Sequence, residues 1–138
     1  MRIDYRRGLL SREDEPVAGA GTRMRIENGV MCVPVVVNGG TPRWTRVDTG
    51  CTFPLYWCAG ADCRRNGGAR SLALASFTGS AVRAQVRVGT ADLADLPVKI
   101  RAREIFPGEA GLLGNGALSR YRVTIDRIGN RLVLEQAE

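Results

Sequence analysis

The sequence contains no histidine, and this absence excludes more functions than any other feature of its composition. Without histidine, the chain has no serine–histidine–aspartate triad, no cysteine–histidine dyad and no histidine-containing metal site. Lysine is almost absent too, because 19 of the 20 basic residues are arginine. Long apolar runs are also missing, since none approaches the roughly 18–20 residues that span a bilayer. The first residues show no signal-peptide pattern, and the sequence leaves the compartment unknown.

The length and composition indicate one globular domain. The chain has 138 residues, of which 44% are hydrophobic and 25% charged. Its 17 glycines and 6 prolines are spread along the sequence, which favours turns between short strands over disorder. The net charge of +6 comes from scattered arginines, many of them alternating with apolar residues. We interpret this charge as a solvated basic surface and expect no nucleic-acid partner, because no strand carries the alternating aromatic residues that stack on bases.

The pattern of the chain changes near residue 28. Residues 1–28 are polar, charged and interrupted by glycine, so they are predicted to be an N-terminal extension or first strand. Residues 29–138 are predicted to be the folded domain. This domain opens with VMCVPVVVNGG, a β-branched run that ends in Asn38 and Gly39, which is a strong hairpin signal.

Short strands separated by turns continue to the end of the chain. The returning strand of the first hairpin is predicted over residues 41–47, and Asp48 follows at its end. Further strands are predicted over residues 71–89 (two strands), 96–100, 122–126 and 131–135, and one brief helix over residues 117–121. Regular short strands with one small helix predict an all-β fold, namely a closed antiparallel β barrel with a short C-terminal helix and a single lobe.

Asp48 is the most unusual residue of this pattern. Aspartate is a poor strand residue and is rarely buried without partners, yet it follows an apolar strand in VDTGCTFPLYWC. A simple explanation is that Asp48 ends the strand and bonds its own turn. The alternative is a carboxylate held in place for chemistry, with Gly50 letting the backbone turn close to it. No other aspartate of the sequence has this context.

A second motif favours the chemical explanation. This motif is Leu112, Leu113 and Gly114, and its glycine lies 66 positions after Asp48. Such a flat aliphatic segment can pass under the loop of residues 48–50 and support it. Asp-Thr-Gly alone is a weak match, but its order and spacing with the Asn-Gly hairpin and with Leu-Leu-Gly make the combination fairly specific.

Together these motifs resemble the aspartic peptidases, and the single Asp-Thr-Gly copy resembles their retropepsin-like branch of bacterial type. The resemblance covers about residues 30–134. It implies that Asp48, Thr49 and Gly50 form the catalytic loop, that Leu112, Leu113 and Gly114 support it, and that Phe77, Thr78 and Gly79 form a flap over the substrate.

The resemblance also implies a mechanism and a partner. Two aspartates hold one water between them, share a proton because two close carboxylates do not both ionise easily, and hydrolyse a peptide bond without a cofactor. This chain supplies one such aspartate, so the enzyme would be a homodimer with Asp48 from each subunit. The implied function is an aspartic endopeptidase acting on an extended polypeptide.

Three departures from the family pattern favour an alternative. Cys51 stands where the family usually has a small or hydroxyl residue, and a thiol is a weak donor toward Asp48. Arg46 stands where an apolar residue is commoner, and its charge would hinder proton sharing. Asn115 replaces an arginine of many viral members. The alternative function is a catalytically weak or inactive dimeric module that binds peptides on the same fold.

The four cysteines lack the paired spacing of a zinc site, so no metal is expected. The family resemblance implies a small loop closed by a disulfide between Cys58 and Cys63. Hairpin counting also brings Cys32 toward Cys51. In an oxidising compartment two disulfides could therefore form, and the cysteines permit an exported protein. In the cytosol the cysteines would stay thiols.

Overall fold

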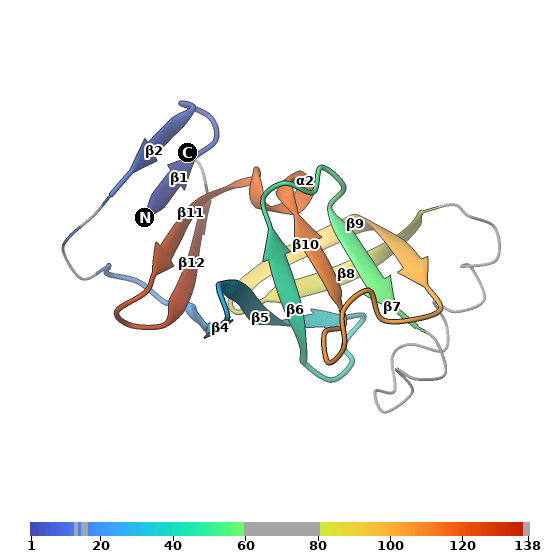
Figure 1. Cartoon of the computed structure of the whole chain (residues 1–138). Coiled ribbons are helices and arrows are strands. Elements are labelled where there is room, and N and C mark those ends of the chain that lie inside the picture. The colour runs from blue at the N-terminus through green and yellow to red at the C-terminus, as the bar shows by residue number, and fades with distance from the viewer. Residues whose placement is uncertain (13, 15–16, 60–80, 137–138) are drawn as a thin grey trace.

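The structure is a computed structural model that describes residues 1–12, 14, 17–59 and 81–136, and its strands form two sheets (Figure 1). The larger sheet contains β4 (Arg25–Glu27), β5 (Val30–Val37), β6 (Arg43–Asp48), β7 (Leu55–Cys58), β8 (Val82–Val88), β9 (Ala91–Arg101) and β10 (Gly111–Gly114). The smaller sheet contains β1 (Arg2–Asp4), β2 (Leu9–Ser11), β3 (Thr22–Arg23), β11 (Tyr121–Asp126) and β12 (Arg131–Gln136).

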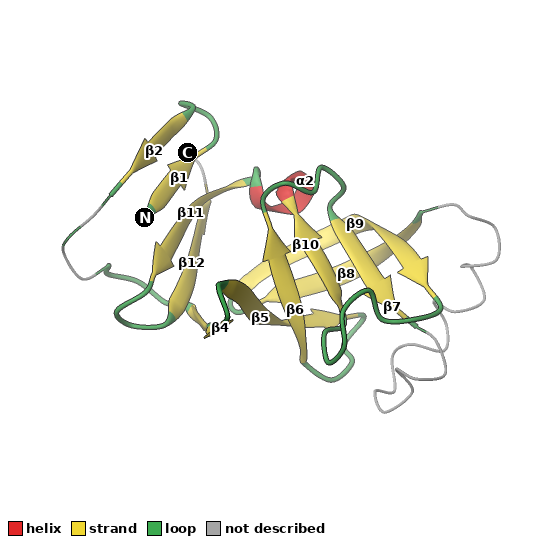
Figure 2. Ribbon diagram, viewed as in Figure 1, coloured by secondary structure: helices red, strands yellow, loops and turns green. Residues whose placement is uncertain are grey.

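The larger sheet closes into a barrel. Its strand order is β4-β5-β6-β10-β7-β9-β8, and β5 pairs with β8 as well as with β6, so six strands form a ring. The short helix α2 (Asn115–Leu118) follows β10 directly and lies at one end of the barrel (Figure 2). The predicted all-β closed barrel with one short C-terminal helix is therefore confirmed. Most of its pairings are antiparallel, but β6–β10 and β7–β9 are parallel.

The first hairpin forms where the sequence predicts it. Asn38 and Gly39 both have positive φ, 49° and 69°, as the tight turns that join twisted strands require. The amide of Gly40 donates to the carbonyl of Val37 at 3.0 Å and closes the turn. The returning strand β6 buries Thr45 completely, because alternate residues of this strand face the barrel interior.

One continuous core joins the barrel, the helix and the smaller sheet. Its largest fully buried side chains come from all three parts of the fold, and they include Leu55, Leu96, Leu113, Leu118 and Leu132. The smaller sheet therefore packs on the barrel through apolar side chains. The first and the last strands of the described chain, β1 and β12, both lie in this sheet (Figure 1).

The N-terminal residues are tied to the C-terminal hairpin. β1 lies between β2 and β11 in the smaller sheet, and Met24 is buried in the core. Arg131 of β12 donates to the carbonyl oxygens of Val17 and Gly19, at 2.6 and 3.0 Å. Residues 1–28 thus contribute strands to both sheets.

The strand and helix bounds differ from the sequence interpretation in several places, and the first of the two strands predicted within residues 71–89 lies outside the described residues. The sequence analysis assigned no strand to residues 55–58, where β7 forms between β10 and β9. β9 begins at Ala91 and not at residue 96, because its acidic residues face solvent beside arginines of β8. The helix ends at Leu118, since Tyr121 is buried and pairs with Gln136. Within the described residues, no helix has the length and apolar character needed to cross a membrane.

Leu96 provides a test of the core. It is fully buried, so replacing it by alanine should lower the free energy of unfolding by about 2–5 kcal/mol. The Ile128→Ala variant is the control, because Ile128 is 89% exposed and its truncation should change stability by less than about 0.5 kcal/mol. Urea unfolding at one protein concentration measures both variants. Equal losses would contradict the assigned core.

Asp126 makes the fold sensitive to acid. The amides of Ile128 and Gly129 and the guanidinium of Arg131 donate to its carboxylate. These interactions, the Gly129 bond foremost, lower the pKa of Asp126 below its ordinary value. A lowered folded-state pKa gives stability that is present above the unfolded-state pKa and is lost as the pH falls through the folded-state pKa.

The Asp126→Asn variant should therefore be less stable than the wild type at neutral pH, and the difference should shrink as the pH falls through the lowered pKa. Thermal unfolding of both proteins between neutral and strongly acidic pH measures it. A difference that stays constant over this range would contradict the assigned role of the Asp126 charge.

Candidate active site

Asp48 ends β6 and opens a tight loop. Its Oδ1 accepts a hydrogen bond from the amide of Gly50 at 2.9 Å, and its carbonyl accepts one from the amide of Cys51 at 3.2 Å. A Cβ added at Gly50 would lie 3.2 Å from Asp48 Oδ1, so glycine leaves the space that the carboxylate occupies. A carboxylate that bonds its own turn also occurs in loops without function, and the loop geometry by itself is therefore weak support for catalysis.

The stronger feature is the strand beside the loop. β10 runs parallel to β6 in a register that sets Leu112 beside Arg46, Leu113 beside Val47 and Gly114 beside Asp48. The structure thus brings the two sequence motifs together, 66 residues apart in the chain.

Gly114 is buried at the point where β10 meets the Asp48 loop. A Cβ there would collide with the carbonyl oxygen of Phe53 and would lie 2.6 Å from that of Cys51. No residue larger than glycine fits without moving the loop backbone.

The start of α2 holds the same loop from its far side. The amides of Asn115 and Gly116 donate to the carbonyl oxygens of Cys51 and Thr52, at 2.7 and 3.1 Å. The side chain of Asn115 donates from Nδ2 to the carbonyl oxygen of Thr49 at 2.5 Å. The loop is therefore fixed by hydrogen bonds on both sides, while Thr49 and Gly50 remain exposed.

Asp48 differs from the other aspartates in its electrostatic surroundings. Among the described residues, every other aspartate lies within 3.7 Å of an arginine nitrogen, in the pairs Asp4–Arg122, Asp14–Arg12, Asp92–Arg87, Asp95–Arg83 and Asp126–Arg131. Asp48 alone in this set has no such partner, and it is only partly exposed. Its carboxylate is held by an amide, not by a cation, which leaves it available for chemistry.

Arg46 is engaged elsewhere, although it lies two residues before Asp48. Its Nε and Nη2 donate to the two carboxylate oxygens of Glu109, at 2.8 and 2.9 Å. Its guanidinium also stacks on the ring of Phe106, 3.5 Å from the ring centroid. The bond to Glu109 raises the pKa of Arg46 above its ordinary value. The Arg46 charge is therefore paired with the buried Glu109, which the sequence pattern does not single out, while the Asp48 carboxylate adds a weaker attraction to the same guanidinium.

The cysteines agree in part with the sequence expectations. Cys32 and Cys51 are free thiols, so the alternative bridge between them is wrong. Cys32 pairs with Arg46 in the β5–β6 ladder, and burial raises the pKa of its thiol. The Sγ of Cys51 lies 3.7 Å from the carbonyl oxygen of Phe53, which is the hydrogen bond it makes.

Several predicted residues lie outside the described part of the chain. They are the flap residues Phe77, Thr78 and Gly79, and Cys63, the predicted disulfide partner of Cys58. The flap and the disulfide remain predictions. Within residues 1–12, 14, 17–59 and 81–136, no cluster of acidic or cysteine side chains has the arrangement of a metal site.

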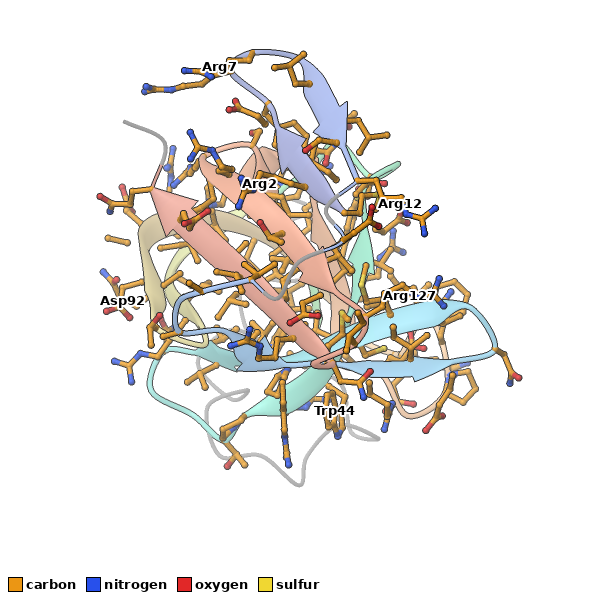
Figure 3. All side chains as sticks on the ribbon, turned by 90° about the vertical axis from the view of Figure 1, so that its left-hand side faces the viewer. Arg2, Arg7, Arg12, Trp44, Asp92 and Arg127 are labelled. Carbon is orange, nitrogen blue, oxygen red and sulfur yellow. The ribbon has the colours of Figure 1, made fainter. Side chains whose placement is uncertain are left out.

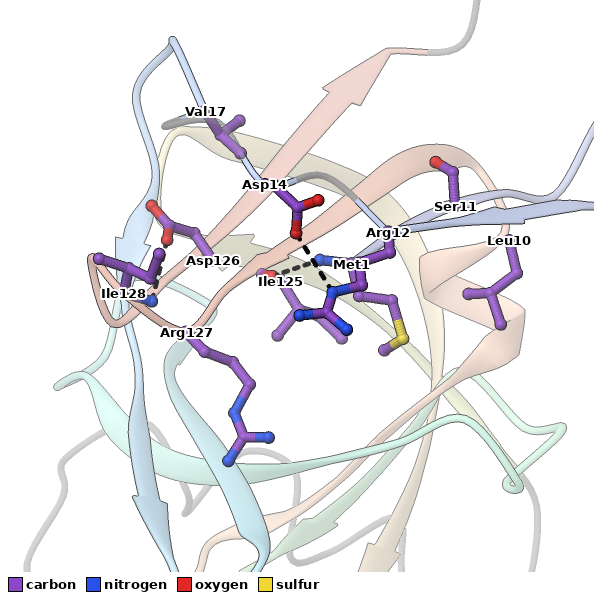
Figure 4. Close-up of a pocket in the computed structure, with 10 residues that line it drawn as sticks. All are labelled: Met1, Leu10, Ser11, Arg12, Asp14, Val17, Ile125, Asp126, Arg127 and Ile128. Atoms are coloured by element: carbon purple, nitrogen blue, oxygen red, sulfur yellow. Dashed lines mark hydrogen bonds and ion pairs between the residues drawn. The ribbon is translucent and has the colours of Figure 1, made fainter.

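A hollow of about 750 Å³ lies on the smaller sheet, away from the Asp48 loop (Figure 4). Its walls come from β2, from the segment that follows β2 and from the β11–β12 turn, with Leu10, Val17 and Ile125 among its apolar residues. None of its lining residues belongs to β6, β10 or the loop between residues 48 and 54. The hollow is therefore not part of the candidate active site.

The basic residues form no single patch on the face that Figure 3 presents. Arg7, Arg12 and Arg127 project from separate elements there. Elsewhere, arginines are paired with nearby carboxylates, as in Arg83–Asp95 at 3.7 Å.

Comparison with known proteins supports the fold. A retropepsin-like aspartic protease from Rickettsia conorii, known from a crystal structure, superposes with a TM-score of 0.55 over 84% of this chain and 89% of that chain. The two sequences are 16% identical, so the likeness establishes the retropepsin-like fold alone. No protein-family model matches the sequence. No curated protein matches it either.

The Arg46–Glu109 pair provides a test of the site's surroundings. Replacing Glu109 by glutamine removes one charge from a largely buried pair, whose side chains are 23% and 10% exposed. We expect the free energy of unfolding to fall by about 1.5–3 kcal/mol, as for hydrogen bonds to charged groups.

The matched control is Asp92→Asn. It breaks the Arg87–Asp92 pair, which has the same 2.9 Å separation but side chains 62% and 70% exposed. Exposed pairs contribute less than about 1 kcal/mol, so this variant should be close to the wild type. Urea unfolding compares the two variants. An equal loss in both would contradict the buried role of Glu109.

Proposed function

We propose that the protein is an aspartic endopeptidase whose active site forms when two copies of the chain bring their Asp48 carboxylates together. The observation that carries the proposal is the parallel register of β6 and β10, which sets Gly114 beside Asp48 at the end of the barrel. A carboxylate without an ion pair is held there on a rigid support. The retropepsin-like fold is the scaffold on which this arrangement is expected.

The proposed reaction needs two carboxyl groups with different roles. One ionised Asp48 takes a proton from a water held between the two subunits, and the water oxygen bonds to the peptide carbonyl carbon. The protonated Asp48 of the partner subunit gives its proton to the carbonyl oxygen. Collapse of this intermediate breaks the C–N bond, with a proton passing to the amine that leaves.

Among the aspartates that the structure describes, only Asp48 is suited to supply these groups. The other described aspartates are each paired with an arginine. The exposed side of the Asp48 loop, at Thr49 and Gly50, is where the second chain would approach. The Thr49 hydroxyl would lock the two loops together.

The proposed substrate is an extended polypeptide. A segment in strand conformation lies between the subunits and pairs with strand edges through its backbone. Phe77, Thr78 and Gly79 would cover it as a flap. The reaction needs no cofactor, because both proton transfers use carboxyl groups of the protein.

Asp48→Asn tests the proposal. The variant keeps the size of the side chain but has no carboxylate to accept or give the proton, so peptide cleavage should fall by at least about 10²- to 10⁴-fold. Wild-type activity should be greatest at acidic pH, where one proton is shared between the carboxylates, and it should rise more steeply than linearly with protein concentration, because the site needs two chains. Cleavage of a peptide panel measures all three effects.

Asp92→Asn is the matched control, because it makes the same chemical change at an exposed aspartate of β9 and should leave cleavage unchanged. Cleavage retained by Asp48→Asn would refute the role of Asp48. Activity strictly proportional to concentration, with a monomer at every concentration used, would refute the dimeric site.

A second candidate function rests on Cys51. Its thiol donates to the carbonyl oxygen of Phe53 and not to the carboxylate of Asp48. This arrangement favours a dimeric module that binds peptides on the same fold and turns them over weakly or not at all. A transition-state inhibitor of aspartic peptidases separates the candidates, since binding of the inhibitor without cleavage of any peptide favours the module.

A further inference from the structure

The N-terminal segment reaches the Asp48 loop through a chain of hydrogen bonds. The hydroxyl of Tyr5, just after β1, donates to Oδ1 of Asn115 at 2.7 Å. Nδ2 of the same Asn115 donates to the carbonyl oxygen of Thr49 at 2.5 Å. Three segments that lie far apart in the sequence therefore meet at the residue that follows Asp48.

We propose that Asn115 and Tyr5 are positioning residues that set the direction of the Asp48 carboxylate through the backbone of its loop. The inference rests on the proposed peptidase function, because it assigns these residues to that reaction. Neither residue touches the carboxylate. Both act through the peptide unit that joins Thr49 to Gly50.

The geometry of the loop explains how this control works. Asn115 contacts the loop twice, with its side chain on the carbonyl of Thr49 and with its backbone amide on the carbonyl of Cys51. These two carbonyls flank Gly50, whose amide donates to Asp48 Oδ1 at 2.9 Å. The side-chain bond fixes the Thr49–Gly50 peptide unit, which carries the Gly50 N–H, and thus the direction of that N–H bond and of the carboxylate that accepts it. The backbone bond holds the Cys51–Thr52 unit further along the same loop.

Tyr5 determines which way the Asn115 amide faces. A primary amide has a donor end and an acceptor end. Because the Tyr5 hydroxyl occupies the acceptor oxygen, the NH₂ group is directed to Thr49. Tyr5 is itself partly buried, and burial raises the pKa of its hydroxyl, which keeps it a donor over the working range of pH. Tyr5 follows directly on β1, whose Asp4 pairs with Arg122 of β11. The carboxylate of Asp48 is therefore coupled to the smaller sheet through Asn115 and Tyr5.

Tyr5→Phe is the main test, because it removes one hydroxyl and leaves the ring. Two quantities are measured on the full chain. The first is hydrogen exchange at the amides of Gly50 and Cys51, which should become roughly 2- to 12-fold faster, as expected for one lost hydrogen bond. The second is peptide cleavage, where kcat should fall roughly 2- to 12-fold with KM changed by less than about 2-fold, since the substrate contacts are unaltered.

Tyr121→Phe is the matched control. Tyr121 is buried in the core, and its hydroxyl donates to the carbonyl of Asp92 in β9 at 3.5 Å, not to the Asp48 loop. This variant should leave the exchange of the loop amides and kcat unchanged. The amide of Val33, in the barrel core, serves as an internal reference for global opening. The double variant Tyr5→Phe with Asn115→Ala should be no worse than Asn115→Ala alone, because both changes break one chain of bonds.

Faster exchange confined to the loop together with lower kcat supports the inference. Unchanged exchange of Gly50 and Cys51 in Tyr5→Phe overturns it, and so does a change in KM alone. Exchange that rises equally at Val33 also overturns it, because the effect is then global destabilisation. A wild type that cleaves no peptide refutes the proposed function, and the exchange measurement then decides alone whether Tyr5 positions the loop.

Discussion

The parallel pairing of β6 with β10 is the constraint on which the rest of the structure depends. Neighbouring parallel strands cannot be joined by a tight turn, so the chain between them must make a long excursion. Here the excursion includes β7, β8 and β9, which complete the barrel between Asp48 and Gly111. The segment that brings Gly114 beside Asp48 is thus the same segment that closes the fold, and the position of the carboxylate is as stable as the barrel.

The charges around the site follow from the same arrangement. A chain with 20 basic residues would be expected to neutralise any carboxylate within reach. The structure avoids this at Asp48 because Arg46, the nearest arginine in the sequence, bonds both oxygens of Glu109 and lies on Phe106. Glu109 reaches Arg46 because residues 102–110 return to the barrel just before β10. An acidic residue distant in sequence thereby keeps Asp48 free of a cation.

The sequence predicts the parts of the fold that depend on local chemistry. The Asn38–Gly39 turn needs positive φ at both positions, and the strands around it alternate between core and solvent, so both were recognisable. The relation of Asp48 to Leu112 and Gly114 was also predictable, because motif order and spacing carry it. β7 was missed because its four residues are too short to display an alternating pattern.

Contacts between distant residues could not be derived from one sequence. Glu109 lies in a stretch that resembles an ordinary turn, and Tyr5 lies in a segment that resembles a loosely packed extension. Their roles depend on closure of the chain over 63 and 110 residues, respectively. Glu109 and Tyr5 are the hydrogen-bond partners of Arg46 and Asn115, two residues that differ from the retropepsin-like pattern near the Asp48 loop. Arg46 acquires a carboxylate partner. Asn115 supports the loop with an amide that accepts from Tyr5 and donates to Thr49, whereas a guanidinium has donors only. The positions at which the sequence departs from the retropepsin-like pattern thus make a different set of contacts around the same loop. Asp48 stays partly exposed there, beside the exposed Thr49 and Gly50.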